Sequence, residues 1–172
     1  MADHTHIENN LQEHYLYPGK IFCSKKPHVV HTILGSCIAV YLWDPSLNFG
    51  GVNHYMLPVK ENSTSFKYGS VAIPDLIKRM LQMGSVKNNL RAKIFGGGEM
   101  ANSNSIFSIG SRNIILAQET LKNEKIPIVS FSVGGHLGRK VIVYTATGEV
   151  FISQIRQDVE VVDKKISKSP GK

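Results

Sequence analysis

The fold depends on two apolar runs, Thr32-Ile33-Leu34-Gly35-Ser36-Cys37-Ile38-Ala39-Val40-Tyr41-Leu42-Trp43 and Gly50-Gly51-Val52-Asn53-His54-Tyr55-Met56-Leu57. The turn-forming segment 44–48 separates them, and continuous apolar runs bounded by turn residues predict buried strands. Each run contains one residue that is unusual in a simple core, Cys37 in the first and His54 in the second. Pairing of the two runs as neighbouring strands brings the thiol and the imidazole together.

Cys37 and His54 together predict nucleophilic cysteine chemistry. A free thiol has a pKa of about 8.5 and is mostly protonated at neutral pH, so an adjacent histidine is needed to form the thiolate. Gly35 and Ser36 directly before Cys37 allow a sharp turn and a close approach to a ligand. The nearest hydroxyls that can orient His54 are those of Thr32 and Ser36. In the alternative interpretation, Cys37 is a small buried hydrophobe and His54 a core histidine bonded to a backbone carbonyl.

The chain has 172 residues, of which 42% are hydrophobic and 19% charged, and its formal net charge is +7. This length and composition predict one globular domain, and no run approaches the ~20 apolar residues of a membrane span. The sequence shows neither a signal-peptide pattern nor a disulfide scaffold, so we expect a cytoplasmic protein with free thiols. We expect a flexible arm over residues 1–17, a single domain over 18–157 and a basic tail over 158–172.

Hydrophobic periodicity predicts a mixed α/β protein with two helices. The first helix is predicted by an amphipathic stripe at Ile73, Leu76, Ile77, Met80 and Leu81. Pro74 then falls in its first turn and Gly84 at its C-terminal end. A second helix is expected over residues 111–123. Strands are expected over residues 21–23, 28–43, 49–57, 92–95, 128–131, 141–146 and 150–155.

No cofactor and no metal site is predicted. The run Gly96-Gly97-Gly98-Glu99 follows a predicted strand, but it lacks both the ending of a phosphate-binding P-loop and the spacing of a dinucleotide site. A tight turn near the site is the favoured interpretation of this run. No Cys and His spacing suits zinc. The lysines of the tail are typical of a solvated terminus, and neither nucleic-acid binding nor membrane insertion is expected.

Segments spread along the chain share one family pattern. Two of them are Leu34-Gly35-Ser36-Cys37 and Gly51-Val52-Asn53-His54-Tyr55-Met56-Leu57-Pro58. The others are residues 68–69, 72–74, 93–98, 109–113, 133–135, 138–139 and 147–150. Over roughly residues 18–156 the chain resembles the chemoreceptor glutamine deamidases, the CheD family of bacterial chemotaxis.

This resemblance implies a layered α/β fold, a mixed β-sheet sandwich with two main amphipathic helices, similar to cysteine deamidase toxins. It implies a cofactor-free amidohydrolase that converts glutamines on the cytoplasmic helical rods of chemoreceptors to glutamates. Cys37 and His54 match the nucleophile and the base of the family, and Thr32 matches the hydroxyl residue that is the third catalytic member. Ser36 and Asn53, which directly precede Cys37 and His54, are predicted to bind the substrate. A CheC-type chemotaxis phosphatase is an implied partner.

Two other functions are compatible with the same residues. A non-catalytic adaptor would dock on receptors or on the phosphatase, and Cys37 would then be structural. A receptor methylesterase, or a transglutaminating enzyme, would share the Cys–His pair and the thioester and differ in the leaving group or the acceptor. Release of ammonia or of methanol separates deamidation from ester hydrolysis.

Overall fold

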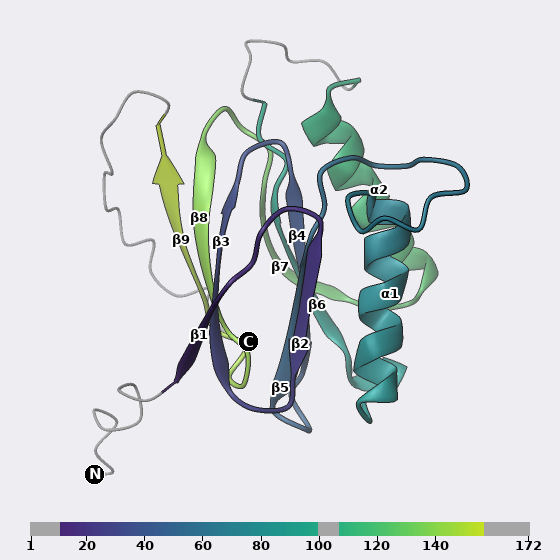
Figure 1. Ribbon diagram of the computed structural model, residues 1–172, viewed down its shortest axis with the longest axis vertical. Helices are drawn as coiled ribbons and strands as arrows, with labels where there is room; N and C mark the ends of the chain where they lie inside the picture. The colour runs from purple at the N-terminus through teal and green to yellow at the C-terminus, as the bar shows by residue number, and fades with distance from the viewer. Residues whose placement is uncertain (1–10, 100–106, 157–172) are drawn as a thin grey trace.

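The computed structural model describes residues 11–99 and 107–156, which form two β-sheets and a layer of helices (Figure 1). The outer sheet has the strand order β1 (Gln12–Tyr15), β3 (His28–Leu34), β8 (Gly138–Tyr144) and β9 (Val150–Ile155). The central sheet has the order β2 (Lys20–Ser24), β5 (Phe49–His54), β4 (Ile38–Asp44), β6 (Arg91–Gly96) and β7 (Ile128–Val133). The helices are α1 (Gly69–Gln82) and α2 (Ile109–Asn123), with a short 3-10 turn at Lys87–Asn89. The predicted layered α/β sandwich with two main helices is confirmed.

The first apolar run of the sequence folds as two strands in different sheets. Strand β3 ends at Leu34 in the outer sheet, and β4 begins at Ile38 in the central sheet. Residues 35–37, here called the crossover segment, connect them. We expected residues 28–43 to be extended, with a break in the run at Gly35 and Ser36. The change of sheet at this break was not predicted, because both strands are apolar and hydrophobicity does not reveal it. The predicted pairing of the two apolar runs is confirmed, since β4 and β5 are antiparallel neighbours.

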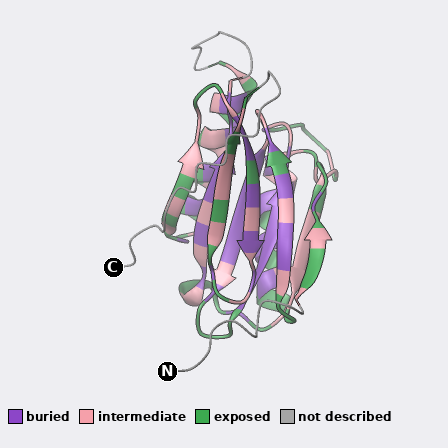
Figure 2. Cartoon of the chain, turned by 90° about the vertical axis from the view of Figure 1, so that its left-hand side faces the viewer, coloured by how far each residue is buried: buried purple, intermediate pink, exposed green. Residues whose placement is uncertain are grey.

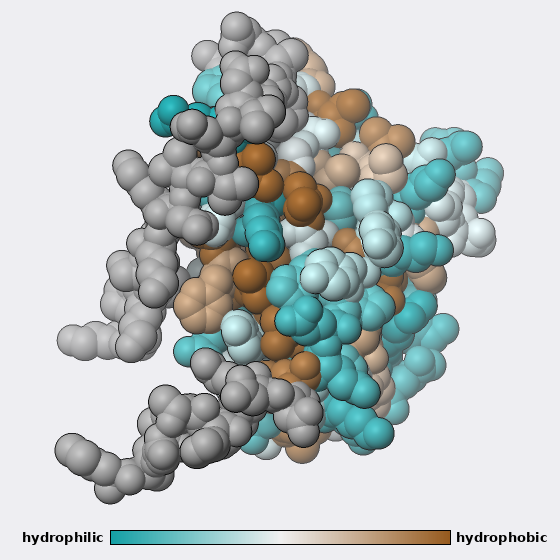
Figure 3. Space-filling view, turned by 60° about the vertical axis from the view of Figure 1, so that its left-hand side comes forward, coloured by the Kyte–Doolittle hydropathy of each residue, from teal (hydrophilic) through white to brown (hydrophobic). Residues whose placement is uncertain are grey.

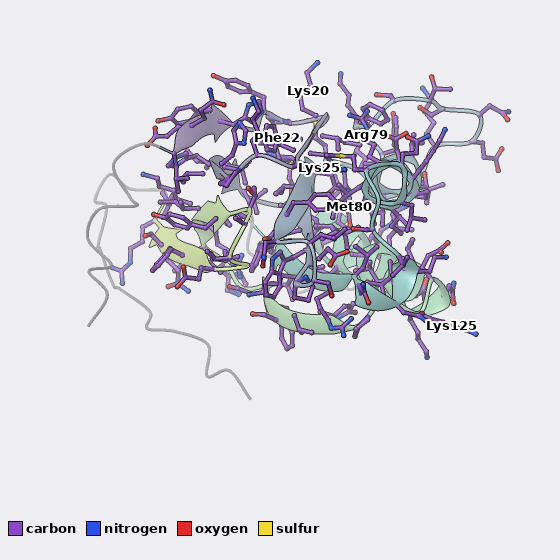
Figure 4. All side chains as sticks on the ribbon, turned by 90° about the horizontal axis from the view of Figure 1, so that it is seen from below. Lys20, Phe22, Lys25, Arg79, Met80 and Lys125 are labelled. Atoms are coloured by element: carbon purple, nitrogen blue, oxygen red, sulfur yellow. The ribbon has the colours of Figure 1, made fainter. Side chains whose placement is uncertain are left out.

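The three middle strands of the central sheet, β5, β4 and β6, are mostly buried on both faces, which explains their apolar sequences. In β4, Ala39 and Tyr41 pack into a core between the two sheets, whereas Val40 and Leu42 pack into a second core beneath the helices. Helix α1 covers β5, β2 and β4, and α2 covers β4, β6 and β7 (Figure 1). Seen from below, Met80 lies on the side of α1 that faces the central sheet (Figure 4).

The outer sheet leaves one face to solvent. Its strands alternate between buried and exposed residues, and no described helix covers the exposed face (Figure 2). Apolar side chains lie among polar ones on this side of the molecule (Figure 3), and Ile33 and Phe151 are among the exposed large hydrophobic residues. Strand β1 pairs in parallel with β3, and it falls within the segment 1–17 that we expected to be a flexible arm. Residues 1–10 of that arm, and the whole of the expected tail, lie outside the described residues.

Both helices follow the predicted stripes, but α1 starts earlier than its stripe suggested. Its first residue is Gly69, so Pro74 lies in the second turn rather than the first. The polar residues Gly69 and Ser70 begin the helix without an apolar signal, which is why sequence periodicity missed them. Gly84 follows the C-terminal end with a φ of +107°, as expected of a helix-terminating glycine. Within residues 11–99 and 107–156, no helix combines the length and apolar composition that a membrane crossing requires.

Truncating a buried residue of α1 is expected to destabilise the fold far more than truncating an exposed one. Leu76 is fully buried between α1 and the central sheet, so Leu76→Ala should lower the free energy of unfolding by about 2–5 kcal/mol. Leu81→Ala is the matched control on the same helix, because Leu81 is 36% exposed. This variant should lower the free energy of unfolding by only about 1 kcal/mol. Urea denaturation of both variants measures the difference. Equal losses would contradict the orientation of α1.

Candidate active site

A hydrogen bond between Thr32 and His54 crosses the core between the two sheets. Thr32 lies in β3 of the outer sheet, and His54 is the last residue of β5 in the central sheet. The Thr32 Oγ1 and His54 Nδ1 atoms are 2.8 Å apart, and Oγ1 is also 2.8 Å from the carbonyl oxygen of Leu16. Both side chains are buried. The sandwich therefore brings together a histidine and a threonine that are 22 positions apart in the sequence.

The Leu16 carbonyl determines which atoms of this chain of hydrogen bonds carry protons. A carbonyl oxygen is an acceptor, so the Thr32 hydroxyl donates its single proton to Leu16. The same hydroxyl oxygen then accepts the Nδ1–H of His54, and Nε2 of the neutral ring is unprotonated. Nε2 is buried and has no hydrogen-bond partner within the described part of the chain. His54 is therefore held in the tautomer that leaves Nε2 free to act as a general base.

Cys37 lies on the same face of the central sheet as His54. Ile38 pairs with Tyr55 at this end of the β4–β5 ladder, which places Ala39 opposite His54. Because alternate residues share a face, Cys37 is the diagonal neighbour of His54, and such neighbours are about 7–8 Å apart. The Cys37 side chain is half-buried and packs against the core between the sheets. The sulfur is not hydrogen-bonded to Nε2, a common situation in unliganded sites.

The glycine run after β6 holds the crossover segment in place. The N–H groups of Gly97 and Gly98 donate to the carbonyl oxygens of Cys37 and Gly35, each at 2.8 Å. Gly96 has a φ of +106°, and a Cβ there would collide with the Cys37 carbonyl oxygen. These N–H groups bind protein carbonyls, so the run acts as a turn beside the site, as the sequence indicated, and these two donors are not directed at a phosphate.

Asn113 of α2 also holds this region, and the sequence analysis did not select it. Its Nδ2 donates to the carbonyl oxygens of Ser36 and Met56 at 3.0 and 2.9 Å, and the residue is fully buried. One signal for it exists in the sequence. Asn113 precedes the inward-facing Ala117 and Leu121 by four and eight residues, so helical periodicity places a polar residue on the buried face.

The two residues predicted to bind substrate lie in different environments. Ser36 is half-buried in the crossover segment, next to Cys37. Asn53 is fully buried and accepts a hydrogen bond from the Val40 N–H at 2.9 Å through Oδ1. Strand alternation places Asn53 on the opposite face of the sheet from His54. That Asn53 contacts the substrate stays a prediction. The hydrogen bond from the Val40 N–H to Asn53 favours a role in fixing the register between β4 and β5.

Burial keeps both reactive groups neutral at rest. It raises the pKa of the Cys37 thiol, while the backbone N–H of Cys37 itself lowers it to a smaller extent. Burial also lowers the pKa of His54 to about 4, and the Leu16 carbonyl opposes this shift. A raised thiol pKa and a lowered imidazole pKa both disfavour the thiolate–imidazolium pair. Both side chains are therefore expected to be uncharged near neutral pH.

The second cysteine is a core thiol, as predicted. Cys23 lies in β2 beneath α1 and faces Gly51 of the neighbouring strand. Burial raises the pKa of its thiol to about 12, so Cys23 is unreactive at neutral pH. Among residues 11–99 and 107–156, no three His, Cys, Asp or Glu side chains gather in a way that would hold a metal ion. Cys37 is therefore the cysteine of interest.

Comparison with known proteins identifies the family of this chain. Residues 56–154 match the family described as CheD chemotactic sensory transduction. The chain belongs to the CheD family. A relative from Trichlorobacter lovleyi is 39% identical over 150 residues, covering 86% of this chain and 93% of that protein. One from Sulfurimonas denitrificans is 35% identical, covering 85% and 96%, and one from Rhodospirillum rubrum is 36% identical, covering 89% and 88%.

Each of these three CheD relatives is named a probable chemoreceptor glutamine deamidase. The family match itself begins at Met56, just after His54. The first relative's match spans 86% of the 172 residues, so about 24 residues lie outside it. A continuous span of that extent includes both Cys37 and His54. The likeness to these relatives thus extends over Thr32, Cys37 and His54.

The depressed pKa of His54 predicts a pH-dependent stability. In the unfolded chain His54 binds a proton near pH 6.5, but in the folded protein it does so at about pH 4. Between these values the unfolded state binds more protons, so stability falls as the pH is lowered. Between pH 7 and pH 4 the His54 contribution to this loss should be about 3 kcal/mol. Urea denaturation across this range measures it.

The control for this prediction is His54→Gln, which lacks the titrating ring. All other titratable groups are common to both proteins, so the difference between the two pH profiles isolates His54. We expect the variant to lose clearly less stability on acidification than the wild-type protein. Parallel profiles would contradict the neutral, buried state of His54.

Proposed function

We propose that this protein is a chemoreceptor glutamine deamidase in which Cys37 is the nucleophile. The observation that carries the proposal is the buried His54, whose Nδ1–H is bound by Thr32 and whose free Nε2 lies on the Cys37 face of the sheet. Nucleophile, base and orienting group form the arrangement that activates a cysteine. The names of the CheD relatives support receptor glutamines as the substrate.

In the first step, the carboxamide of a receptor glutamine enters beside Cys37. His54 Nε2 takes the thiol proton, and the sulfur attacks the carboxamide carbon to form a tetrahedral intermediate. Thr32 keeps the Nδ1–H in place during this transfer, and the Leu16 carbonyl favours the imidazolium that forms. Proton transfer and attack are coupled, because the two groups are neutral at rest.

The negative oxygen of the intermediate requires a hydrogen-bond donor. We assign this role to the Cys37 N–H, which lies next to the thiol and lowers its pKa. One such donor typically lowers the barrier by about 3 kcal/mol. The imidazolium of His54 then gives its proton to the departing nitrogen, the C–N bond breaks, and ammonia leaves. The acyl group remains on Cys37 as a thioester.

Water completes the reaction. His54 Nε2, again neutral, removes a proton from a water molecule, and the resulting hydroxide adds to the thioester carbonyl. The C–S bond breaks, and the proton returns from His54 to the Cys37 sulfur. The net change is the conversion of glutamine and water to glutamate and ammonia. Each turnover adds one negative charge to the receptor helix.

Partner and location follow from this substrate. A positive enzyme favours encounter with an acidic helical bundle, and the formal net charge of this chain is +7. Two of its lysines, Lys20 and Lys125, lie far apart on the molecule seen from below (Figure 4). We include in the proposal a cytoplasmic location, where receptor signalling rods lie, and a CheC-type phosphatase as a second partner. Ser36 is proposed to contact the substrate beside Cys37.

Cys37→Ala is expected to abolish deamidation, because no other group forms the thioester. The assay incubates purified protein with a receptor cytoplasmic fragment and follows ammonia release and the mass change from glutamine to glutamate. Cys23→Ala is the control, and it should retain activity because Cys23 lies in the helix-side core. Methanol release from a methylated fragment would favour the esterase, and absence of both products would favour the adaptor. Repeating the assay with a CheC-type phosphatase tests the second partner.

Thr32→Val is expected to lower kcat by about 10²-fold or more, because it removes the acceptor that fixes the His54 tautomer. Valine has nearly the shape of threonine, so the packing between the sheets is retained. Thr32→Ser keeps the hydroxyl and should retain most of the activity. The measurement is steady-state ammonia release with the same receptor fragment. Equal activity of the valine and serine variants would reject the orienting role of the hydroxyl.

A further inference from the structure

Asn113 links two strand ends at the edge of the candidate site. The last pairing of β4 with β5 at this end is the bridge between Ile38 and Tyr55. Beyond this bridge, the Asn113 amide donates to the carbonyl oxygens of Ser36 and Met56. An amide nitrogen carries two protons, so these two bonds use its full donor capacity. The side chain therefore continues the ladder by one step after the backbone pairing has ended.

The peptide plane between Ser36 and Cys37 connects this contact to the reacting atoms. The peptide is trans, and in a trans peptide the N–H points away from the C=O of the same plane. The bond from Asn113 to the Ser36 carbonyl therefore also fixes the direction of the Cys37 N–H. Among residues 11–99 and 107–156, this N–H makes no hydrogen bond to another residue. The same N–H lowers the pKa of the adjacent Cys37 thiol.

The neighbouring planes of the crossover segment are fixed in the same way. The carbonyl of Gly35 is bound by the Gly98 N–H, and the carbonyl of Cys37 is bound by the Gly97 N–H. All three carbonyls of the segment thus have donors, and the middle one depends on a side chain from a helix. A side-chain donor can be removed by substitution, whereas the two backbone donors cannot.

From this geometry we propose that Asn113 is a positioning residue that aims the Cys37 N–H at the carbonyl oxygen of the substrate. The inference rests on the proposed function, because the N–H acts on the oxyanion of the acyl-transfer intermediate. Asn113 is fully buried and does not itself touch the substrate. Its contribution is to orient a donor before the reaction begins, which removes a reorganisation cost from the barrier.

Within the described residues, the Asn113 side chain makes hydrogen bonds only through its two N–H donors. Its Oδ1 is buried and has no hydrogen-bond partner in the described part of the chain, and an unsatisfied buried acceptor is destabilising. The Tyr55 hydroxyl bonds to the backbone carbonyl of Asn113 at 2.5 Å, so the backbone is anchored independently of the amide. The amide is therefore best explained by the two carbonyls that it holds.

The test compares Asn113→Ala and Asn113→Asp with Leu121→Ala. Alanine removes both donors, whereas aspartate keeps the shape of the side chain but has no N–H and can donate at most one O–H. Leu121 is a fully buried residue of the same helix, so its variant reports the effect of a weakened α2 alone. Kinetics of ammonia release from a receptor cytoplasmic fragment are measured at a temperature where circular dichroism shows each variant to be folded. Should one Asn113 variant fail to fold, the other decides.

We expect kcat to fall by about 10²-fold in the Asn113 variants, with KM within about twofold of wild type, because a misdirected donor affects the transition state. Leu121→Ala should keep the wild-type kcat. The inference is overturned if the folded Asn113 variants keep the wild-type kcat, or if Leu121→Ala loses as much activity as they do.

A second measurement needs no receptor. Iodoacetamide alkylation of Cys37, followed by mass spectrometry of the peptide across pH, reports the pKa of the thiol. The Cys37 N–H lowers that pKa, so the alkylation midpoint should move to higher pH in Asn113→Ala and stay unchanged in Leu121→Ala. A shifted midpoint in a protein that releases no ammonia would reject deamidation and retain the positioning role. An unshifted midpoint in Asn113→Ala would reject the positioning role.

Discussion

The hydrogen bond between Thr32 and His54 crosses the core between the two sheets, and the geometry of the site depends on it. Each partner belongs to a different sheet, so any relative shift of the sheets changes the orientation of the imidazole. The same core of apolar side chains that stabilises the sandwich therefore also sets the position of the base. The Leu16 carbonyl adds a third contribution, from the end of a strand in the outer sheet. The packing between the two sheets and the geometry of the site therefore depend on the same contacts.

The crossover segment shows how hydrogen bonds from distant elements can hold a cysteine between two sheets. Three residues carry the chain from β3 to β4, and the carbonyl of each is bound by a donor from another part of the molecule. The donors come from the glycine run after β6 and from α2, elements distant in sequence. Glycine is required at residue 96 because a side chain there would displace Cys37. A segment held at every carbonyl keeps its remaining N–H groups in fixed directions, as preorganised catalysis requires.

The sequence predicted those residues of the site whose side chains are unusual for their position in the chain. Cys37 and His54 stand out because each interrupts an apolar run, and the pairing of those runs follows from their length and the turn between them. The role of the Leu16 carbonyl was not predictable, because every residue has a backbone carbonyl and the sequence does not show which one bonds to Thr32. The strand before it, Gln12–Tyr15, is also mostly polar and gives no signal of a buried element. Asn113 was missed because a polar helix residue is usually solvated. The roles in catalysis and substrate binding stay predictions.

The neutral resting state of the pair has a physical rationale for an enzyme that acts on a protein side chain. A thiol is oxidised or alkylated in proportion to its thiolate content, so a raised pKa makes the Cys37 thiol less reactive. In the proposed mechanism, attack must create two charges in a poorly solvated place. The Leu16 carbonyl and the Thr32 hydroxyl would then support the imidazolium, and the Cys37 N–H would support the oxyanion. Charge would be stabilised where the intermediate forms it, and a thiol without a bound carboxamide would stay unreactive.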